Sequence, residues 1–259
     1  MTSAGLLVVA SIAPLLAEPR ADAEQTSQRL AGHELEVLEV RTPWFRVRGR
    51  DGYEGWVHAG YVRAVAAREV ARRYAGPRTS LGCVAVTGDG HRRALPLGAV
   101  LADDETVESG EVVEADALRT RFPADPAAAA HTALTRFEGA PYQWGGITPW
   151  GADCSGMLQT TFGLHGFVLP RDAWQQAEAG ATIAPLVESL AAGYLLFFST
   201  RTDQRATHVA IALGGDRMVH SAIGRGGWCV ERLSKTDDPY VGTLRARITG
   251  ARRLSRSAR

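Results

Sequence analysis

Short runs of alternating polar and apolar residues fill the first 65 positions of the chain and leave little room for a helix. Charged and apolar residues alternate through Glu34–Val40, which predicts a half-buried strand with one face in water. The run at 45–48 alternates in the same way, and Asp51-Gly52 is a hairpin signal before a returning strand at Gly55–Val57. Several short strands joined by tight turns predict a small β-barrel over residues 1–65.

The next segment repeats this style less regularly. Residues 66–78 are expected to form a short helical connector that Gly76-Pro77 closes. Short apolar runs separated by turns then follow between residues 80 and 118, for example at Cys83–Val86 and Ala99–Leu101. We therefore predict a second, degenerate barrel of the same type, and with its connector this domain spans residues 66–122.

From residue 123 onward the pattern changes to longer elements. Asp125 is a suitable helix N-cap, and Pro126 suits the first helical position. Three apolar runs, at Tyr194–Phe198, His208–Leu213 and Met218–Ser221, predict buried strands. The final residues, 252–259, are expected to be a solvated basic tail. Residues 123–259 thus read as a separate α+β domain, which makes three domains in the 259-residue chain.

Composition limits the classes of partner and cofactor. The formal net charge is +1, and we see no basic stripe with interleaved aromatic residues, so nucleic acid is not an expected partner. Three cysteines form neither a disulfide framework nor the paired spacing of a zinc site. We therefore expect no metal and no organic cofactor.

The amino-terminal segment bears on localisation. The apolar stretch that begins at Leu6 lacks a preceding basic region, and Pro14 and Glu18 interrupt it early, so it does not resemble a signal peptide. The sequence contains no apolar run of the roughly 18 to 20 residues that a membrane span needs, and no membrane partner is expected. We expect a cytoplasmic protein, with a secreted or wall-associated protein as the alternative.

One cysteine lies where a fold could make it reactive. Gly145-Gly146 and Pro149 break the chain before Cys154, and the residues after it suit a buried helix, so Cys154 is expected near a helix N-terminus. A thiol there needs a base, and His208 opens an apolar strand that could supply one. His220, on the following strand, could fix the tautomer of His208. For Cys83 and Cys229 we keep the simpler interpretation, inert packing.

The motifs around these residues closely resemble those of the NlpC-type bacterial cell-wall peptidases, which are papain-like cysteine enzymes. The resemblance covers roughly residues 125–250, and the first 65 residues resemble a bacterial SH3-like domain. The peptidase motifs follow one another in the family's order: Pro141–Gly146, Asp153–Gly156, Leu169–Asp172 with Gln175-Gln176, His208–Gly214 and Met218–Ser221. The implied fold is a papain-like peptidase domain, with a helix packed on an antiparallel sheet, preceded by two small SH3-like barrels.

By this resemblance Cys154 is the nucleophile, His208 the base and His220 the orienting residue. Members with an SH3-like domain and a Pro-Arg-Asp block resemble γ-D-glutamyl-L-diamino-acid endopeptidases. Those require a free N-terminal L-alanine, because the first barrel closes one end of the groove. The chain departs from many members at Tyr194, where they carry an acidic residue, and at Ala173, where relatives often have a hydroxyl.

Recognition of a substrate ammonium group requires an acid and hydrogen-bond acceptors. Asp172 is the leading candidate for the acid, with Tyr142, Asp153 and Ser155 expected to line the cleft near the nucleophile. From the first barrel, Glu18 and Tyr53 match positions that face the active site in such members. For each of these residues, the alternative is an ordinary role in a surface turn.

The resemblance implies a peptidase that cleaves murein-derived L-Ala-γ-D-Glu-diamino acid peptides during recycling of the cell wall. One alternative is a secreted hydrolase that acts on intact peptidoglycan. Another is a wall-binding module in which the barrels carry the function and the catalytic domain has decayed. Acyl transfer on lipids occurs in the wider superfamily, but Cys154 precedes His208 here, which is not the order of the circularly permuted lipid-modifying branch.

Overall fold

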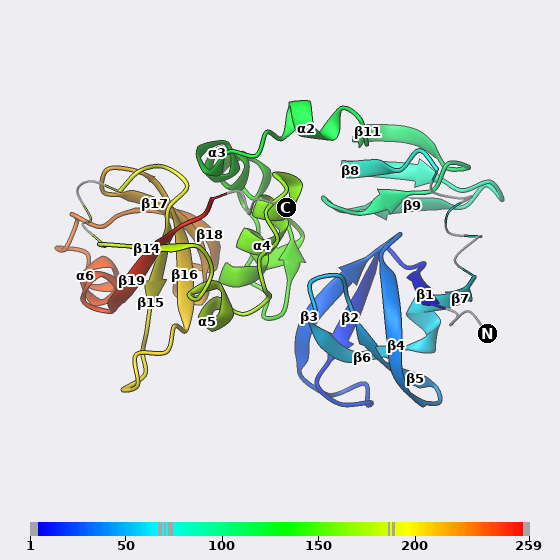
Figure 1. Cartoon of the computed structure of the whole chain (residues 1–259), viewed down its shortest axis with the longest axis horizontal. Coiled ribbons are helices and arrows are strands. Elements are labelled where there is room, and N and C mark those ends of the chain that lie inside the picture. The colour runs from blue at the N-terminus through cyan, green and yellow to red at the C-terminus, as the bar shows by residue number, and fades with distance from the viewer. Residues whose placement is uncertain are drawn as a thin grey trace. The chain divides into compact units, whose positions relative to one another are not determined.

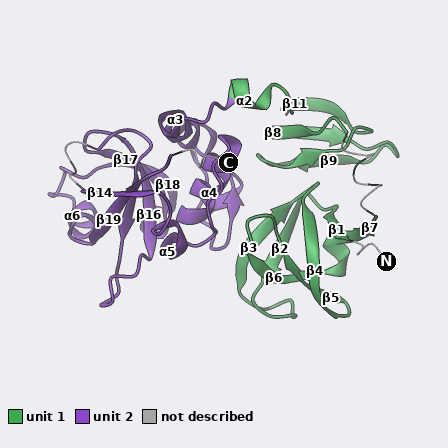
Figure 2. Cartoon of the chain, viewed as in Figure 1, with its two compact units in different colours: residues 1–121 green, residues 122–259 purple. Residues whose placement is uncertain are grey.

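The computed structural model of the chain describes residues 5–66, 69, 71, 75–185, 187 and 190–255 (Figure 1). These residues form two compact units, 1–121 and 122–259, which Figure 2 colours separately. Residues 67, 68, 70 and 72–74 of the predicted connector lie outside the described part of the chain. The division into three domains remains a prediction.

Unit 1 begins with a seven-stranded antiparallel sheet in the order β3-β2-β6-β5-β4-β1-β7. Its strands are β1 (Gly5–Val8), β2 (Ile12–Leu16), β3 (Gln25–Leu30), β4 (Glu34–Arg41), β5 (Trp44–Arg48), β6 (Glu54–His58) and β7 (Val62–Val65), with a 3₁₀ turn η1 (Ala59–Tyr61) before the last. One core contains side chains from strands far apart in this order, including Leu15 of β2, the second strand, and Val62 of β7, the last. The sheet therefore curls around a single interior, as expected of a small barrel.

A second, four-stranded antiparallel sheet follows in unit 1. Its strands are β8 (Arg78–Val86), β9 (Arg92–Leu95), β10 (Val100–Leu101) and β11 (Thr106–Glu114), and the short helix α2 (Leu118–Arg121) ends the unit. Two contacts join this sheet to the first one. The Val100 N–H donates to the Ala31 carbonyl at 2.9 Å, and His33 Nε2 lies 3.3 Å from the Gly98 carbonyl oxygen.

Unit 2 is built around a six-stranded antiparallel sheet in the order β14-β19-β15-β16-β17-β18. Its strands are β14 (Ala181–Ile183), β15 (Leu195–Phe198), β16 (His208–Gly214), β17 (Arg217–Ala222), β18 (Gly227–Arg232) and β19 (Ile248–Arg253). The three predicted strands are confirmed as β15, β16 and β17. The prediction of a solvated tail is wrong at its start, because Arg252 and Arg253 belong to β19 and pair with β14.

Helices cover the sheet of unit 2. The elements are α3 (Pro126–Arg136), α4 (Cys154–Leu164), α5 (Ala173–Gln176) and α6 (Pro239–Ala246), with a hairpin of β12 (Ile147–Thr148) and β13 (Gly151–Ala152) and a 3₁₀ turn η3 (Ile223–Arg225). Helices α3 and α4 contact β16 and β17, while Leu244 of α6 joins the core formed with Leu196, Ala210 and Met218. The prediction of α3 is confirmed, including its N-cap, since the Asp125 side chain accepts a hydrogen bond from the Ala127 N–H.

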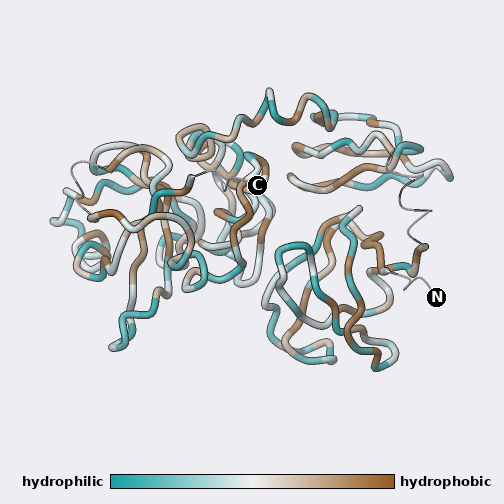
Figure 3. The backbone as a smooth tube through the Cα atoms, viewed as in Figure 1, coloured by the Kyte–Doolittle hydropathy of each residue, from teal (hydrophilic) through white to brown (hydrophobic). Residues whose placement is uncertain are grey.

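Hydropathy follows this layout. The strands at the centre of the unit 2 sheet are hydrophobic, whereas the loop from Ser199 to Thr207 that joins β15 to β16 is largely hydrophilic (Figure 3). Within the described residues, no helix combines the length and the apolar character that a membrane crossing requires.

Candidate active site

Cys154 is the first residue of α4, as predicted, and the residue before it caps the helix. The Asp153 carboxylate accepts hydrogen bonds from the Gly156 N–H at 2.7 Å and from the Gly145 N–H at 2.9 Å. One bond satisfies a free donor of the first helical turn, and the other holds the loop that precedes the hairpin. The nucleophile candidate thus occupies a defined helix start, where the helix dipole favours negative charge.

A buried ion pair supports this cap. Arg171 is only 2% exposed, and its guanidinium binds both carboxylate oxygens of Asp153, at 3.0 and 2.6 Å. The same guanidinium donates to Ser155 Oγ at 2.9 Å, while Ser155 donates to Asp153 at 3.1 Å. Burial makes a bidentate pair of this kind costly to break, because the remaining charge would have no partner.

Backbone packing leaves no space for a side chain on this side of α4. A Cβ atom on Gly156 would overlap the Gly146 carbonyl oxygen, which accepts from the Asp153 N–H at 3.1 Å. The hairpin and the helix start therefore approach each other at backbone distance, which only glycine permits. This contact fixes the direction in which α4 begins.

The two histidines meet on neighbouring strands. His208 opens β16, His220 lies in β17, and His208 Nε2 is 2.7 Å from His220 Nδ1. Since Nε2 of His208 is engaged in this way, its Nδ1 is the nitrogen left to accept a proton from Cys154. A neutral His208 that keeps Nδ1 bare must carry its proton on Nε2 and donate it to His220. His220 is fully buried, which holds its ring in place.

Two further contacts bring the cysteine to the histidine strands. The backbone N–H groups of Val209, next to His208, and of Ser155 both lower the pKa of the Cys154 thiol, which places them close to its sulfur. The Ser221 hydroxyl, next to His220, donates to the Ala152 carbonyl at 2.7 Å, two residues before Cys154. Cys154, His208 and His220 are therefore brought near one another by contacts that involve their immediate chain neighbours.

Burial dominates the ionisation of the three groups. It raises the pKa of the Cys154 thiol to about 12, with a smaller contribution from the Asp153 charge, and it lowers the pKa of His208 to about 4. Burial likewise holds the pKa of His220 well below its ordinary value, with the neighbouring His208 adding to the effect. Neither the thiol nor the imidazole ionises alone near neutral pH, so a proton must pass directly from one to the other.

The arrangement can perform nucleophilic acyl transfer. Proton transfer from Cys154 to His208 creates a thiolate at the N-terminus of a helix, where the N–H of Cys154, as the first of α4, has no partner within the helix. Such N–H groups can stabilise an oxyanion that forms during attack on a carbonyl. The chemistry needed for cleavage of an amide bond is therefore present in unit 2.

The predicted substrate-binding residues of unit 2 fall into two groups. Tyr142 is half-buried, and burial followed by the Cys154 charge raises its pKa, so its hydroxyl keeps a proton that it can donate. Asp172 is half-buried and caps α5 in a reciprocal arrangement with Gln175. Asp153 and Ser155 are instead committed to the Arg171 network, so their observed role is to build the helix start.

The two candidates from the first barrel lie in unit 1. Glu18 is exposed and pairs with Arg20 at 3.3 Å. Tyr53 packs against the core of the first barrel, and its N–H donates to Asp51 at 3.1 Å. Their predicted role at the cleft remains a prediction.

Sequence reasoning missed Arg171, although it lies inside a quoted motif. Arginine is ordinarily a surface residue, and composition gives no sign that this one is buried. The available signal was its position between Pro170 and Asp172 in a chain with an aspartate directly before the nucleophile. A buried cap aspartate requires a cation, and Arg171 provides it.

Comparison with protein families gives two matches. A model of the NlpC/P60 family matches residues 139–243, and a model of the bacterial SH3 domain matches residues 13–63. A crystal structure of an NlpC/P60 family protein from Bacillus cereus ATCC 10987 superimposes with a TM-score of 0.75 at 19% identity, covering 96% of this chain and 99% of that one. The predicted fold class is confirmed by this likeness.

Curated relatives match part of the chain. A γ-D-glutamyl-L-lysine dipeptidyl-peptidase of Bacillus subtilis is 42% identical over 109 residues, which is 42% of this chain but only 36% of that protein's length. The protein named "Probable endopeptidase NlpC" of Escherichia coli is 31% identical over 145 residues, 54% of this chain and 79% of the relative.

We predict that Arg171→Met destabilises the protein by about 3–5 kcal/mol, because it leaves the Asp153 charge buried without its partner. Arg201→Met is the matched control, since Arg201 also binds both carboxylate oxygens of Asp203, through Nε and one terminal nitrogen, but with both side chains about half exposed. Urea unfolding of the full chain measures both effects. Equal midpoints for the two variants would show that the buried pair does not hold the site.

The lowered pKa of His208 predicts the pH dependence of Cys154 alkylation by iodoacetamide. The neutral imidazole is the base, so this base-assisted reaction should be lost as pH falls through about 4. In His208→Ala alkylation should be slower than in the wild type between pH 5 and 8, because burial raises the thiol pKa to about 12 and the base that takes its proton is gone. Mass spectrometry of the Cys154 peptide gives the rates, and a wild-type transition near pH 6.5 would contradict the argument.

Proposed function

The chain belongs to the NlpC/P60 family, as its motifs predicted, and we propose that it is a cysteine peptidase that cleaves peptidoglycan stem peptides. The observation that carries the proposal is the 2.7 Å contact between His208 and His220 beside a cysteine at the start of α4. Nucleophile, base and orienting group are all present, which argues against a decayed catalytic domain that serves only as a wall-binding module.

The proposed reaction has two stages. The Cys154 sulfur attacks the carbonyl carbon of the scissile amide while its proton passes to Nδ1 of His208, and the oxyanion is stabilised by N–H groups at the start of α4. His208 then protonates the leaving amine, and a thioester remains on Cys154. Water, deprotonated by His208, attacks the thioester and releases the carboxylate, which restores the thiol.

The bond we propose is the one between the γ-carboxyl of D-glutamate and the following diamino acid. Support comes from the Bacillus subtilis relative, whose name specifies a γ-D-glutamyl-L-lysine dipeptidyl-peptidase. The other named relative is an endopeptidase, so hydrolysis of an amide bond is common to both names. Whether lysine or diaminopimelate follows the glutamate is left to experiment.

A free N-terminal L-alanine is the second part of the proposed specificity. An ammonium group bound away from bulk water requires an anionic partner, and Asp172, half-buried beside the Arg171 network, is our candidate. Tyr142 would contribute its hydroxyl. A site that reads the amine admits released peptides and excludes intact wall chains, which is why we propose a cytoplasmic role in peptide recycling.

A second candidate function is hydrolysis of intact peptidoglycan by an exported enzyme. It is favoured by another relative, the murein DD-endopeptidase MepS/murein LD-carboxypeptidase of Escherichia coli, which is 35% identical over 123 residues. The two functions differ in one requirement, because a wall hydrolase must accept a peptide whose amine is blocked. That difference can be measured directly.

We predict that the enzyme releases L-Ala-D-Glu from free L-Ala-γ-D-Glu-diamino acid tripeptides and leaves the N-acetylated tripeptides uncut. Both peptides should be tested with meso-diaminopimelate and with L-lysine at the third position, and products identified by mass spectrometry. Cys154→Ala should abolish release, and Asp172→Asn should raise KM for the free amine more than it lowers kcat.

Each outcome separates the hypotheses. Equal cleavage of free and acetylated peptides would retain the peptidase but contradict the recycling role, and cleavage of purified sacculi would then favour the wall hydrolase. Absence of cleavage by a folded protein would contradict the proposed reaction. That result would favour the wall-binding hypothesis, or acyl transfer on another substrate.

A further inference from the structure

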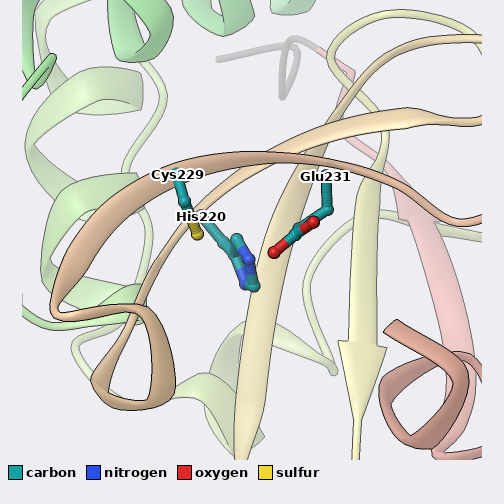
Figure 4. Close-up of side chains that lie close together, drawn as sticks. All are labelled: His220, Cys229 and Glu231. Carbon is teal, nitrogen blue, oxygen red and sulfur yellow. The ribbon is translucent and has the colours of Figure 1, made fainter. Parts of the chain in front are cut away.

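A second group of chemically reactive side chains lies behind the histidine pair. His220 of β17 and Cys229 of β18 are direct partners in the sheet, and Glu231 stands opposite Met218 on the same two strands. One ligand atom from each of His220, Cys229 and Glu231 lies within 4.8 Å of the other two. Figure 4 shows the imidazole of His220 between the sulfur of Cys229 and the carboxylate of Glu231. We call these three residues the β17–β18 cluster.

One nitrogen of His220, Nε2, takes no part in the contact with His208. Its Nδ1 bonds His208, whereas its Nε2 is buried and has no hydrogen-bond partner among the residues that the structure describes. His220 itself is 0% exposed. A buried imidazole nitrogen without a partner is unusual and requires an explanation, and a metal ion is one partner that such a nitrogen can bind.

We propose that the β17–β18 cluster binds a thiophilic divalent cation, Zn²⁺ above all, through His220 Nε2, the Cys229 sulfur and a Glu231 carboxylate oxygen. Imidazole, thiolate and carboxylate are the three ligand types that Zn²⁺ takes, and water would complete the tetrahedron. Tetrahedral ligands with the usual bond lengths lie about 3.6 Å from one another. The atoms of the cluster would therefore need to close by little more than an ångström.

The charges around the cluster are compatible with a cation. Glu231 pairs with Arg225 at 2.7 Å, and Arg225 also pairs with Asp238, so the acidic groups outnumber the arginine. When the ion binds, the Cys229 thiol gives its proton to solvent, and one thiolate and one carboxylate then balance the two positive charges. Cys229 and Glu231 are only half-buried, which leaves the ion a way in.

A metal ion at this site would prevent proton transfer from Cys154 to His208. This effect rests on the proposed function of Cys154, His208 and His220. A metal on His220 Nε2 places the proton of that ring on Nδ1, where it must donate to His208 Nε2. His208 then carries its own proton on Nδ1, which is the nitrogen that should receive the proton of Cys154. The base is thus held in the wrong tautomer without any ligand touching the nucleophile.

Metal binding is tested first in Cys154→Ala, which removes the catalytic thiol as a competing ligand. We expect this full-length variant to bind one Zn²⁺ by calorimetry and one Co²⁺ with the absorption bands of a tetrahedral thiolate complex. Cys154→Ala/Cys229→Ser should bind at least about tenfold more weakly and lose the thiolate band, and Cys154→Ala/Glu231→Gln should weaken binding without losing it. Cys154→Ala/Cys83→Ala is the matched control, since Cys83 is buried in unit 1, and it should bind unchanged.

Inhibition is tested at one pH by alkylation of Cys154, with and without Zn²⁺. Zinc should slow alkylation at least about tenfold in the wild type, and the ratio of the two rates should fall toward one in Cys229→Ser. The proposed metal site would be contradicted if Cys154→Ala bound no metal, or if the thiolate band persisted in Cys154→Ala/Cys229→Ser. Binding without slower alkylation would overturn the switch. Because neither readout uses a peptide, the result is independent of whether the proposed substrate is correct.

Discussion

The buried pair between Arg171 and Asp153 is the interaction on which the catalytic unit depends. Asp153 caps α4, holds the Gly145 loop and binds Ser155, and Arg171 supplies the opposite charge by binding both of its oxygens. A lysine could not replace the arginine, since one ammonium group cannot bind both carboxylate oxygens and Ser155 in the same fork. The position of the nucleophile is thus set by a contact that contributes no group to the reaction.

The sheet supplies the second constraint. Strands β16 and β17 carry one histidine each, and the bond from Ser221 to Ala152 ties β17 to the chain that leads into Cys154. The Nδ1 atom of His220 contacts His208, and one nitrogen of the same ring lies within 4.8 Å of ligand atoms of Cys229 and Glu231. The same buried ring therefore links the catalytic chemistry to a part of the sheet that the proposed reaction does not use, which is what makes control from β18 physically possible.

The sequence allowed prediction of the parts whose chemistry is local. Asp125 and the proline after it predicted α3, and the apolar runs predicted three strands of the unit 2 sheet, because helix capping and burial depend on short sequence patterns. Parts that depend on long-range contacts could not be predicted. The burial of Arg171 depends on Asp153, the role of Cys229 depends on its register opposite His220, and the apparent tail forms β19 only because β14 and β15 present their edges to it. The substrate specificity could not be predicted either, since it depends on groups from several elements.

The proposed catalysis requires a neutral His208 whose proton lies on Nε2 and is shared with His220. The most direct measurement is ¹⁵N NMR of the protein with labelled histidine, in which the nitrogen shifts report the protonation of each ring atom. We expect a bare Nδ1 and a protonated Nε2 for both His208 and His220 in metal-free protein, unchanged between pH 5 and 8, because burial keeps both rings neutral. A proton on Nδ1 of His208 would contradict the assigned direction of proton transfer.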